Sequence, residues 1–184
     1  GPDLESVLAA KGAGAPALSQ RLGKTVLHMD IGGGTSNFAL IKEGKVLRTG
    51  CMNVGGRLVK LDPEGRLTYV SPVLKGIFSY KAGDTPGMDA LETLAKTLAQ
   101  ALEMAASLRE GSSPLQSLYT GEASPWVPPE EEIHLSFSGG VADCIGKDYP
   151  PFAFGDLGPL LGKAIRESRL CQGLYSLGSQ TIRA

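Results

Sequence analysis

Residues 25–41 read TVLHMDIGGGTSNFALI and predict two adjacent strands joined by a glycine loop. The stretch that ends at Ile31 is an apolar run of the kind that forms a buried strand, and residues 36–41 alternate as a second strand. A tight turn at residues 43–44 leads to a third strand-like segment over 45–52. Because the links between these segments are so short, the strands should pair antiparallel. We therefore expect a three-stranded meander that carries a glycine loop.

The segments around this meander predict a single domain of the α/β class over residues 1–184. In the first part, Leu4, Val7 and Leu8 share one helix face. Later strands follow helices and should run parallel, so the expected sheet is mixed and five-stranded. The expected parts are a helical lead-in (1–24), the meander with its glycine loop (25–56), a hairpin insertion (57–83) and a helix–strand–helix–strand unit (84–184).

The last part begins with the longest predicted helix. Its apolar residues keep helical spacing as far as Leu108, and Asp84 or Thr85 can cap its start. The other elements expected in this part are a strand over 133–138, a second helix capped by Asp156 and a final strand over 180–184.

The composition argues against several kinds of partner and site. The chain has 184 residues and a net charge of −1, so it lacks the positive charge of a nucleic-acid binder. No apolar run approaches the roughly 18 residues of a membrane-spanning helix. Cys51, Cys144 and Cys171 form no CxxC pair, which indicates a reducing compartment rather than disulfides or a zinc site. Because the chain starts at Gly1, we interpret it as an internal fragment or a shortened chain without a signal peptide.

The glycine loop has the chemistry of a phosphate site. It is neither a P-loop nor a Rossmann loop, because no Lys-Ser or Lys-Thr pair and no helix follow the glycines. Gly32, Gly33 and Gly34 allow successive backbone N–H groups to face one concavity, and Thr35 and Ser36 add hydroxyl donors.

Asp30 stands at the end of the first strand, immediately before this loop. Its carboxylate can hold Mg²⁺ through water, and strand alternation places His28 on the same face. The alternative is a tight hairpin in which glycine serves turn geometry alone. The acidic residue before the glycines and the hydroxyls after them favour phosphate.

Two motifs resemble the actin/Hsp70/sugar-kinase ATPase superfamily. The loop from Asp30 to Thr35, followed by two strands and Val54-Gly-Gly-Arg57, resembles its second phosphate loop. Ser138-Gly-Gly-Val141 resembles its adenosine motif. The resemblance implies a ribonuclease H-like lobe that binds ATP or ADP with Mg²⁺, in which Asp30 is catalytic and holds the metal through water. The nucleotide contacts that it implies are Gly32, Gly33, Gly34, Thr35, Ser36, Gly55, Gly56, Gly139, Gly140 and Val141.

Five segments spread along the chain are similar to the EutA family, the reactivating factors of ethanolamine ammonia-lyase. They are GPDLESVL at 1–8, MDIGGGTSN at 29–37, NVGGRL at 53–58, LSFSGGV at 135–141 and FGDLGPLL at 154–161. The family implies an ATP-dependent, chaperone-like protein that lets damaged cobalamin leave the lyase. The lyase is then the implied partner, and the cytoplasm is the implied location, with association with the ethanolamine microcompartment left open.

This chain departs from complete members of the superfamily in two respects. It holds one Asp-Gly-Gly-Gly-Thr loop, so we expect the first lobe of the full-length protein to be missing. Arg57 stands where Hsp70-type members carry acidic residues, which argues against direct transfer of the Hsp70 mechanism. We expect ATPase activity of the full-length protein rather than of this chain alone.

Two other functions stay open at this point. One is a non-hydrolysing interaction module of the ethanolamine pathway, and the other is a lobe of a sugar- or acetate-kinase-type phosphotransferase. Among the remaining side chains, His28 and His134 are interpreted as structural. Cys144 is a core residue or a nucleotide contact, and Trp126 either contacts a protein or covers the sheet.

Overall fold

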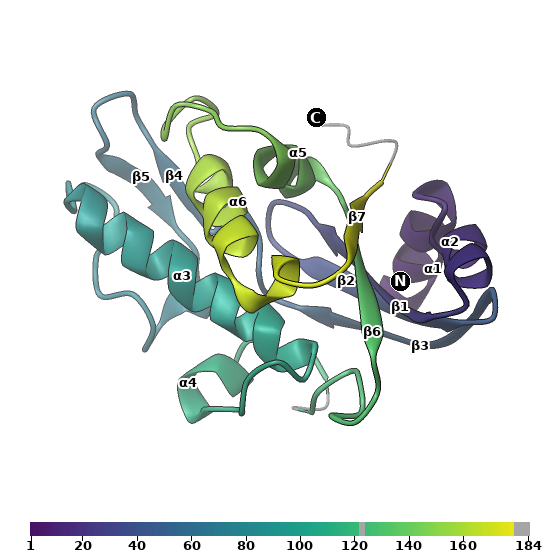
Figure 1. Cartoon of the computed structure of the whole chain (residues 1–184). Helices are drawn as coiled ribbons and strands as arrows, with labels where there is room; N and C mark the ends of the chain where they lie inside the picture. Colours follow the sequence, from purple (N-terminus) through teal and green to yellow (C-terminus); the bar gives the residue numbers. More distant parts are fainter. Residues whose placement is uncertain (122–123, 179–184) are drawn as a thin grey trace.

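The computed structural model describes residues 1–121 and 124–178, which build one mixed sheet with helices on both faces (Figure 1). The strand order is β3-β2-β1-β6-β7, and β1 pairs antiparallel with β2 and parallel with β6. The mixed five-stranded sheet predicted from the sequence is thereby confirmed. The strands are β1 (Thr25–Ile31), β2 (Ser36–Lys42), β3 (Lys45–Met52), β6 (Ile133–Ser138) and β7 (Tyr175–Leu177).

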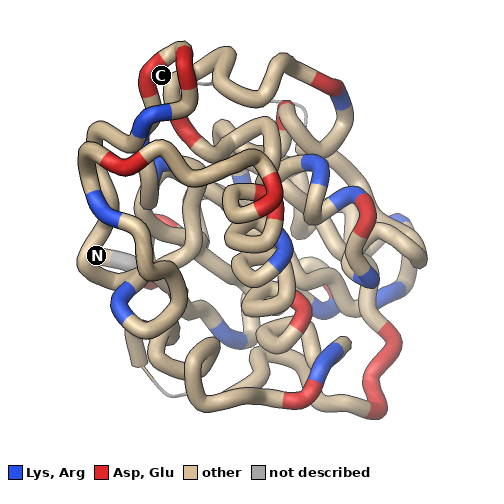
Figure 2. The backbone as a smooth tube through the Cα atoms, turned by 90° about the vertical axis from the view of Figure 1, so that its left-hand side faces the viewer, with Lys and Arg blue, Asp and Glu red and all other residues tan. Residues whose placement is uncertain are grey.

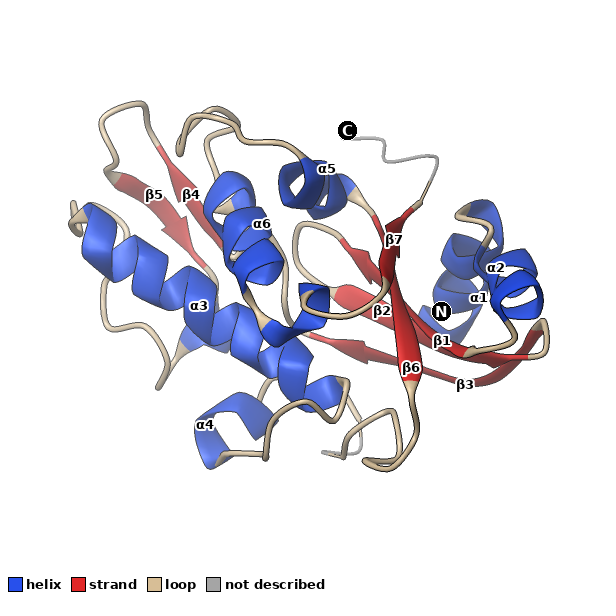
Figure 3. Ribbon diagram, viewed as in Figure 1, coloured by secondary structure: helices blue, strands red, loops and turns tan. Residues whose placement is uncertain are grey.

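Helices cover the two faces of the sheet in separate layers (Figure 3). The lead-in forms α1 (Pro2–Gly12) and α2 (Ala15–Leu22), which pack on one face together with Val26 of β1. The larger core lies on the other face, under α3 (Met88–Ala105), α5 (Gly140–Gly146) and α6 (Gly158–Glu167), and includes Leu27 and Met29. Because side chains alternate along a strand, Asp30 lies on the α1 and α2 side of the sheet.

The lead-in helices are confirmed, but the apolar face expected of the first one is not buried. Leu4 is 60% exposed and Leu8 is 58% exposed. The residues of α1 that face the sheet are small ones, Ser6 and Ala10. Small side chains let the helix lie close to the strands, and this close approach leaves the leucines on the outer side.

The predicted hairpin insertion is a second, two-stranded sheet of β4 (Val59–Leu61) and β5 (Leu67–Val70), followed by the 3₁₀ helix η1 (Pro72–Leu74). It is attached to the segment before α6 through its backbone. The N–H of Leu61 donates to the carbonyl of Gly155 over 2.9 Å, and Lys60 forms a bridge with Asp156.

The longest helix, α3 (Met88–Ala105), starts later than expected. Its N-cap is Gly87, so the prediction of Asp84 or Thr85 as the cap is wrong. The carboxylate of Asp84 instead accepts the N–H of Lys81 over 2.9 Å within a turn. Pro86 therefore lies before the helix. A short helix, α4 (Ser113–Gln116), follows α3.

Trp126 covers the sheet, which is one of the two roles considered for it. Its ring lies 5.8 Å from that of Phe38 and 6.1 Å from that of Tyr119, and only 7% of the residue is exposed. Gly50 leaves the room for it, because a Cβ atom there would lie 1.8 Å from the indole. The expectation of Trp126 as an exposed protein contact is therefore wrong.

The C-terminal part holds more helices than the sequence indicated. Its elements after β6 are α5 (Gly140–Gly146), α6 (Gly158–Glu167) and the 3₁₀ helix η2 (Arg169–Cys171), before β7. The sequence predicted α6 but not α5 and η2, nor the short helix α4 before β6. The fifth strand is β7, and the strand expected over 180–184 lies outside the described residues.

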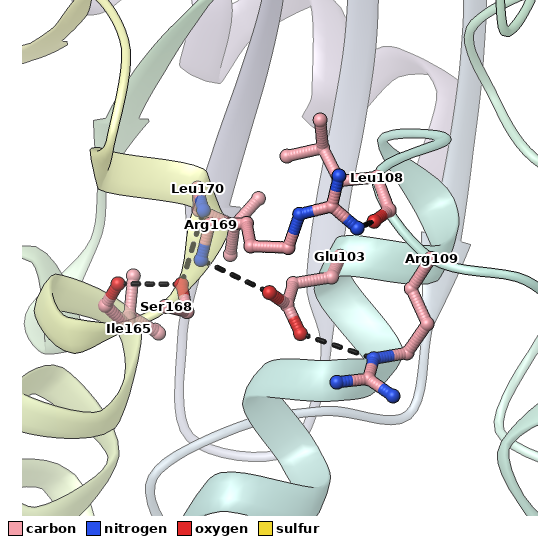
Figure 4. Close-up of polar contacts among 7 residues, drawn as sticks. All are labelled: Glu103, Leu108, Arg109, Ile165, Ser168, Arg169 and Leu170. Atoms are coloured by element: carbon pink, nitrogen blue, oxygen red, sulfur yellow. Dashed lines mark hydrogen bonds and ion pairs between the residues drawn. The ribbon is translucent and has the colours of Figure 1, made fainter.

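A buried carboxylate ties the end of α3 to η2 (Figure 4). Glu103 is 3% exposed, and its two oxygens bind different groups. One accepts the backbone N–H of Arg169 over 3.0 Å, and the other lies 3.2 Å from Nε of Arg109. The side chain of Arg169 in turn donates to the carbonyl of Leu108. These contacts fix the segment that leads into β7.

The charged residues follow no single stripe or patch in the view of Figure 2, where acidic and basic positions are interspersed. None of the helices within residues 1–121 and 124–178 combines the length and the apolar character that crossing a membrane requires.

Candidate functional site

A cleft of about 470 Å³ opens where the parallel strands β1 and β6 end. Its wall is built by three turns that are distant in sequence: the β1–β2 loop with Asp30, Gly32 and Gly33, the pair Gly56–Arg57, and the β6–α5 turn of residues 138–141. The end of α1 and Asp156 complete it. In open α/β sheets, ligands bind at the carboxyl ends of the strands, and this cleft occupies that place.

The two glycine loops are bonded directly to each other. The N–H of Gly56 donates to the carbonyl of Gly32 over 2.9 Å, and the N–H of Arg57 donates to that of Gly33 over 2.7 Å. Gly55 makes this approach possible, because a Cβ atom on it would lie 2.2 Å from the carbonyl oxygen of Gly33. Gly55 therefore allows the two loops to pack against each other and does not itself line the cleft.

The third turn also requires glycine. Gly139 has a φ of +90°, and a Cβ atom there would lie 2.5 Å from the carbonyl oxygen of Ile31 and 2.9 Å from Oδ1 of Asp30. Residues other than glycine rarely adopt such a φ. The turn therefore brings the backbone of residues 139–141 against the end of β1, where Asp30 lies.

Asp30 is held by a chain of hydrogen bonds that runs into the protein. The hydroxyl of Ser138 donates to Oδ1 of Asp30 over 2.7 Å. Nε2 of His28 lies 2.7 Å from the same hydroxyl oxygen, and Nδ1 of His28 lies 3.0 Å from the hydroxyl of Ser136. All of these partners come from β1 and β6, whose register places Asp30 opposite Ser138 and His28 opposite Ser136.

The direction of this chain follows from the chemistry of its ends. An ionised carboxylate can only accept hydrogen bonds, so the hydroxyl of Ser138 donates its one hydrogen to Asp30. This hydroxyl must therefore accept the hydrogen bond from His28. The imidazole is then the Nε2–H tautomer, whose Nδ1 accepts from Ser136. Burial lowers the pKa of His28 to about 4, although the charge of Asp30 acts in the opposite direction. His28 is thus neutral near pH 7, which fits its interpretation as a structural residue.

The structure brings most of the predicted site residues together. The residues that line the cleft are Asp30, Gly32, Gly33, Gly56, Gly139, Gly140 and Val141. Gly34, Thr35, Ser36 and Gly55 lie outside its lining. Gly34 and Thr35 are exposed at the outer part of the loop. Ser36 is fully buried, and its hydroxyl donates to the carbonyl of Val54 over 2.7 Å, so in this structure that donor is used within the protein.

Sequence reasoning did not place Ser138, Arg57 and Asp156 in the site. A signal for Ser138 was present, because His134, Ser136 and Ser138 put polar groups on one side of an otherwise apolar strand. Arg57 ends the motif Val54-Gly-Gly-Arg57, but nothing in the sequence pairs it with Asp156, since 99 residues separate the two members of this ion pair.

The other candidates lie away from the cleft. Nε2 of His134 lies 2.9 Å from the hydroxyl of Ser176, between β6 and the edge strand β7. Cys144 is 1% exposed and packs against Gly162 of α6, where it acts as a core residue.

The cleft fits the groups that the resemblance implied. Glycine at 33, 56 and 139 lets the three turns approach one another, because an added Cβ atom would meet Arg57, Val141 or Ile31. The backbone of these turns lines the cleft of about 470 Å³, so a ligand can lie against it. For the cation, Asp30 is half-buried and keeps one carboxylate oxygen beyond the bond to Ser138. No group of three or more His, Cys, Asp or Glu that could hold a metal occurs among the described residues. One carboxylate with water and ligand phosphates is the usual environment of Mg²⁺ at nucleotides.

Comparisons with known proteins agree with the sequence motifs. The family model "Ethanolamine utilisation protein EutA" matches residues 1–184. The chain is 42% identical to the ethanolamine ammonia-lyase reactivase EutA of Salmonella typhimurium and 39% identical to that of Escherichia coli, in both cases over its whole length. It spans about 40% of the length of these two relatives.

Among solved structures, the Ppx/GppA phosphatase of Aquifex aeolicus aligns with 78% of this chain and 34% of its own, at a TM-score of 0.41 and 14% identity. The evidence for the family is the sequence match, which extends from the first to the last residue. The chain belongs to the EutA family of ethanolamine utilisation proteins.

Proposed function

We propose that this chain is the nucleotide-binding lobe of an ATP-dependent reactivating factor that acts on ethanolamine ammonia-lyase. One observation carries the nucleotide part of the proposal. Three glycine-containing turns, far apart in sequence, meet around one cleft at the end of β1, with Asp30 at its wall. The strand order and directions are those expected of one lobe of an actin-like ATPase.

Each part of the cleft has a role in this proposal. The N–H groups of Gly33 and Gly34 and the hydroxyl of Thr35 bind the β- and γ-phosphates. Gly32 contributes its place in the cleft wall, because its N–H donates to the carbonyl of Thr35 over 3.0 Å. The backbone of residues 139–141 lies against the nucleoside. Asp30 holds hydrated Mg²⁺ and orients the attacking water, and the bound cation supplies charge stabilisation to the phosphates. Ser138 and His28 keep the Asp30 carboxylate in one orientation.

The wider function is supported by the family. Two curated relatives are named ethanolamine ammonia-lyase reactivases, and both are longer than this chain. We propose the lyase as partner, a second lobe that closes on the nucleotide in the complete protein, and a cytoplasmic location. Nucleotide state then changes lobe closure, and closure changes the grip on the lyase, so that damaged cobalamin leaves.

Asp30→Ala in the complete protein is expected to slow ATP hydrolysis about a hundredfold, because the group that orients water and cation is removed. Recovery of lyase that carries damaged cobalamin should fall with it. Asp89→Ala, an equal charge change on an exposed residue of α3, is the control and should leave both rates unchanged. Hydrolysis at the normal rate in the Asp30 variant would disprove the proposed role of this residue.

A further inference from the structure

We propose that Arg57 binds the terminal phosphate of the nucleotide, and that Asp156 is the positioning residue that holds Arg57 for this task. The inference rests on the proposed nucleotide function and adds to it the group that distinguishes ATP from ADP.

Arg57 lies where the phosphates would be. It is the one Lys or Arg among the described residues that line the cleft, and its side chain is 49% exposed. Its N–H donates to the carbonyl of Gly33, and its Cβ and Cδ lie 3.4 Å from where a Cβ atom of Gly33 would be. The stem of the side chain therefore covers the very loop that the proposed function assigns to phosphate.

The chemistry of guanidinium suits this position. It stays charged at any physiological pH and presents a planar fork of N–H donors that matches phosphate oxygens. The other charged residues of the cleft wall, Asp30 and Asp156, are both acidic. Without Arg57 the wall would repel a polyphosphate, and the repulsion would be greater for ATP than for ADP, because ATP carries more negative charge.

Asp156 fixes the arginine from behind. It is 1% exposed, and its Oδ2 lies 3.3 Å from Nε of Arg57. Its Oδ1 accepts the N–H of Gly158 over 2.8 Å, so the carboxylate is anchored at the start of α6. A buried carboxylate with one anchored oxygen cannot move away when a ligand enters, and it holds the guanidinium over the loop.

The test is calorimetric titration of the complete protein with Mg·ATP and Mg·ADP. For Arg57→Gln we expect the Kd for ATP to rise about thirtyfold and that for ADP about threefold, the loss of one charge-assisted contact at the terminal phosphate. Arg66→Gln removes the same charge from an exposed position in the same hairpin and should change neither value. Arg57→Lys, which keeps the charge but not the fork, should lie between wild type and Arg57→Gln, and it serves if the glutamine variant does not fold.

The role of Asp156 has its own readout. Asp156→Asn should lower the ratio of the Kd for ADP to the Kd for ATP. In the double variant with Arg57→Gln, the Asp156 substitution should lower this ratio no further than Arg57→Gln alone does, because both residues act through one contact. A purely structural role of Asp156 would instead weaken both nucleotides equally and add to the effect of Arg57→Gln.

Two results would overturn the inference. If the Arg57 variants lower the affinities for ATP and ADP by the same factor, or by no more than Arg66→Gln does, Arg57 does not bind the terminal phosphate. The proposed nucleotide site would be unaffected by that result. If the wild-type protein binds neither nucleotide, the proposed function itself fails and this inference fails with it.

Discussion

Replacement of Gly139 by alanine is expected to lower the free energy of unfolding by about 3 kcal/mol and to remove nucleotide binding. The backbone here has a φ of +90°, which an L-residue adopts only under strain. The added methyl group would also lie 2.5 Å from the carbonyl oxygen of Ile31 and 2.9 Å from the carboxylate of Asp30. Relief of this clash must move either the turn or Asp30, and both belong to the cleft.

Gly23→Ala measures the cost of a milder positive-φ strain without a clash. Gly23 also has a positive φ, of +61°, but nothing lies within 4 Å of an added Cβ atom. The strain alone should cost about 1 kcal/mol. Urea denaturation of both variants measures the difference, and nucleotide titration should show a loss for Gly139→Ala only. Equal destabilisation by the two substitutions would show that the turn does not press on β1.

Acidification is expected to destabilise the fold through His28. Burial lowers its pKa from about 6.5 to about 4, so between these values the unfolded chain binds a proton that the folded chain does not. The contribution is fully present above pH 6.5 and is lost as the pH falls toward 4. Its size is roughly 3 kcal/mol. Protonation would also place a second proton on the imidazole, at Nδ1, so that the bond with Ser136 must reverse while the bonds through Ser138 to Asp30 keep their direction.

His28→Gln removes this titration while it leaves a donor and an acceptor in the strand. Urea denaturation between pH 4 and pH 7, without added Mg²⁺ or nucleotide, should give a clearly shallower loss of stability for the variant. Burial also lowers the pKa of His134, which contributes in the same direction and is present in both proteins. Parallel curves for the variant and the wild type would contradict the assignment of the effect to His28.

The part of the fold that the sequence predicted best is the part with local signals. The meander was recognisable because apolar runs, glycine turns and short links all lie within residues 25–52, and strands β1, β2 and β3 follow these limits. The hairpin was recognisable for the same reason. In contrast, α5 and β7 are short, and a strand such as Tyr175–Leu177 forms only because β6 offers an edge beside it.

The site divides in the same way. Asp30 and the glycines carry a motif that can be read along the chain. Ser138 depends on the register between β1 and β6, and the Arg57–Asp156 pair depends on how the hairpin meets the start of α6. Such contacts join residues about 100 positions apart, and no local pattern encodes them. Trp126 is a further case, since its place over Gly50 depends on a gap that forms only in the folded sheet.

The most direct test of the nucleotide site is a titration of the ¹⁵N-labelled chain with Mg·ATP, followed by backbone amide NMR signals. We predict that the amide signals of residues 32–34, 56–57 and 139–141 shift together along one binding curve, while those of the exposed residues of α3 stay in place. Asp30→Ala should weaken that curve. Shifts confined to other surfaces, or an unchanged curve in the Asp30 variant, would contradict the claim that this cleft holds the nucleotide.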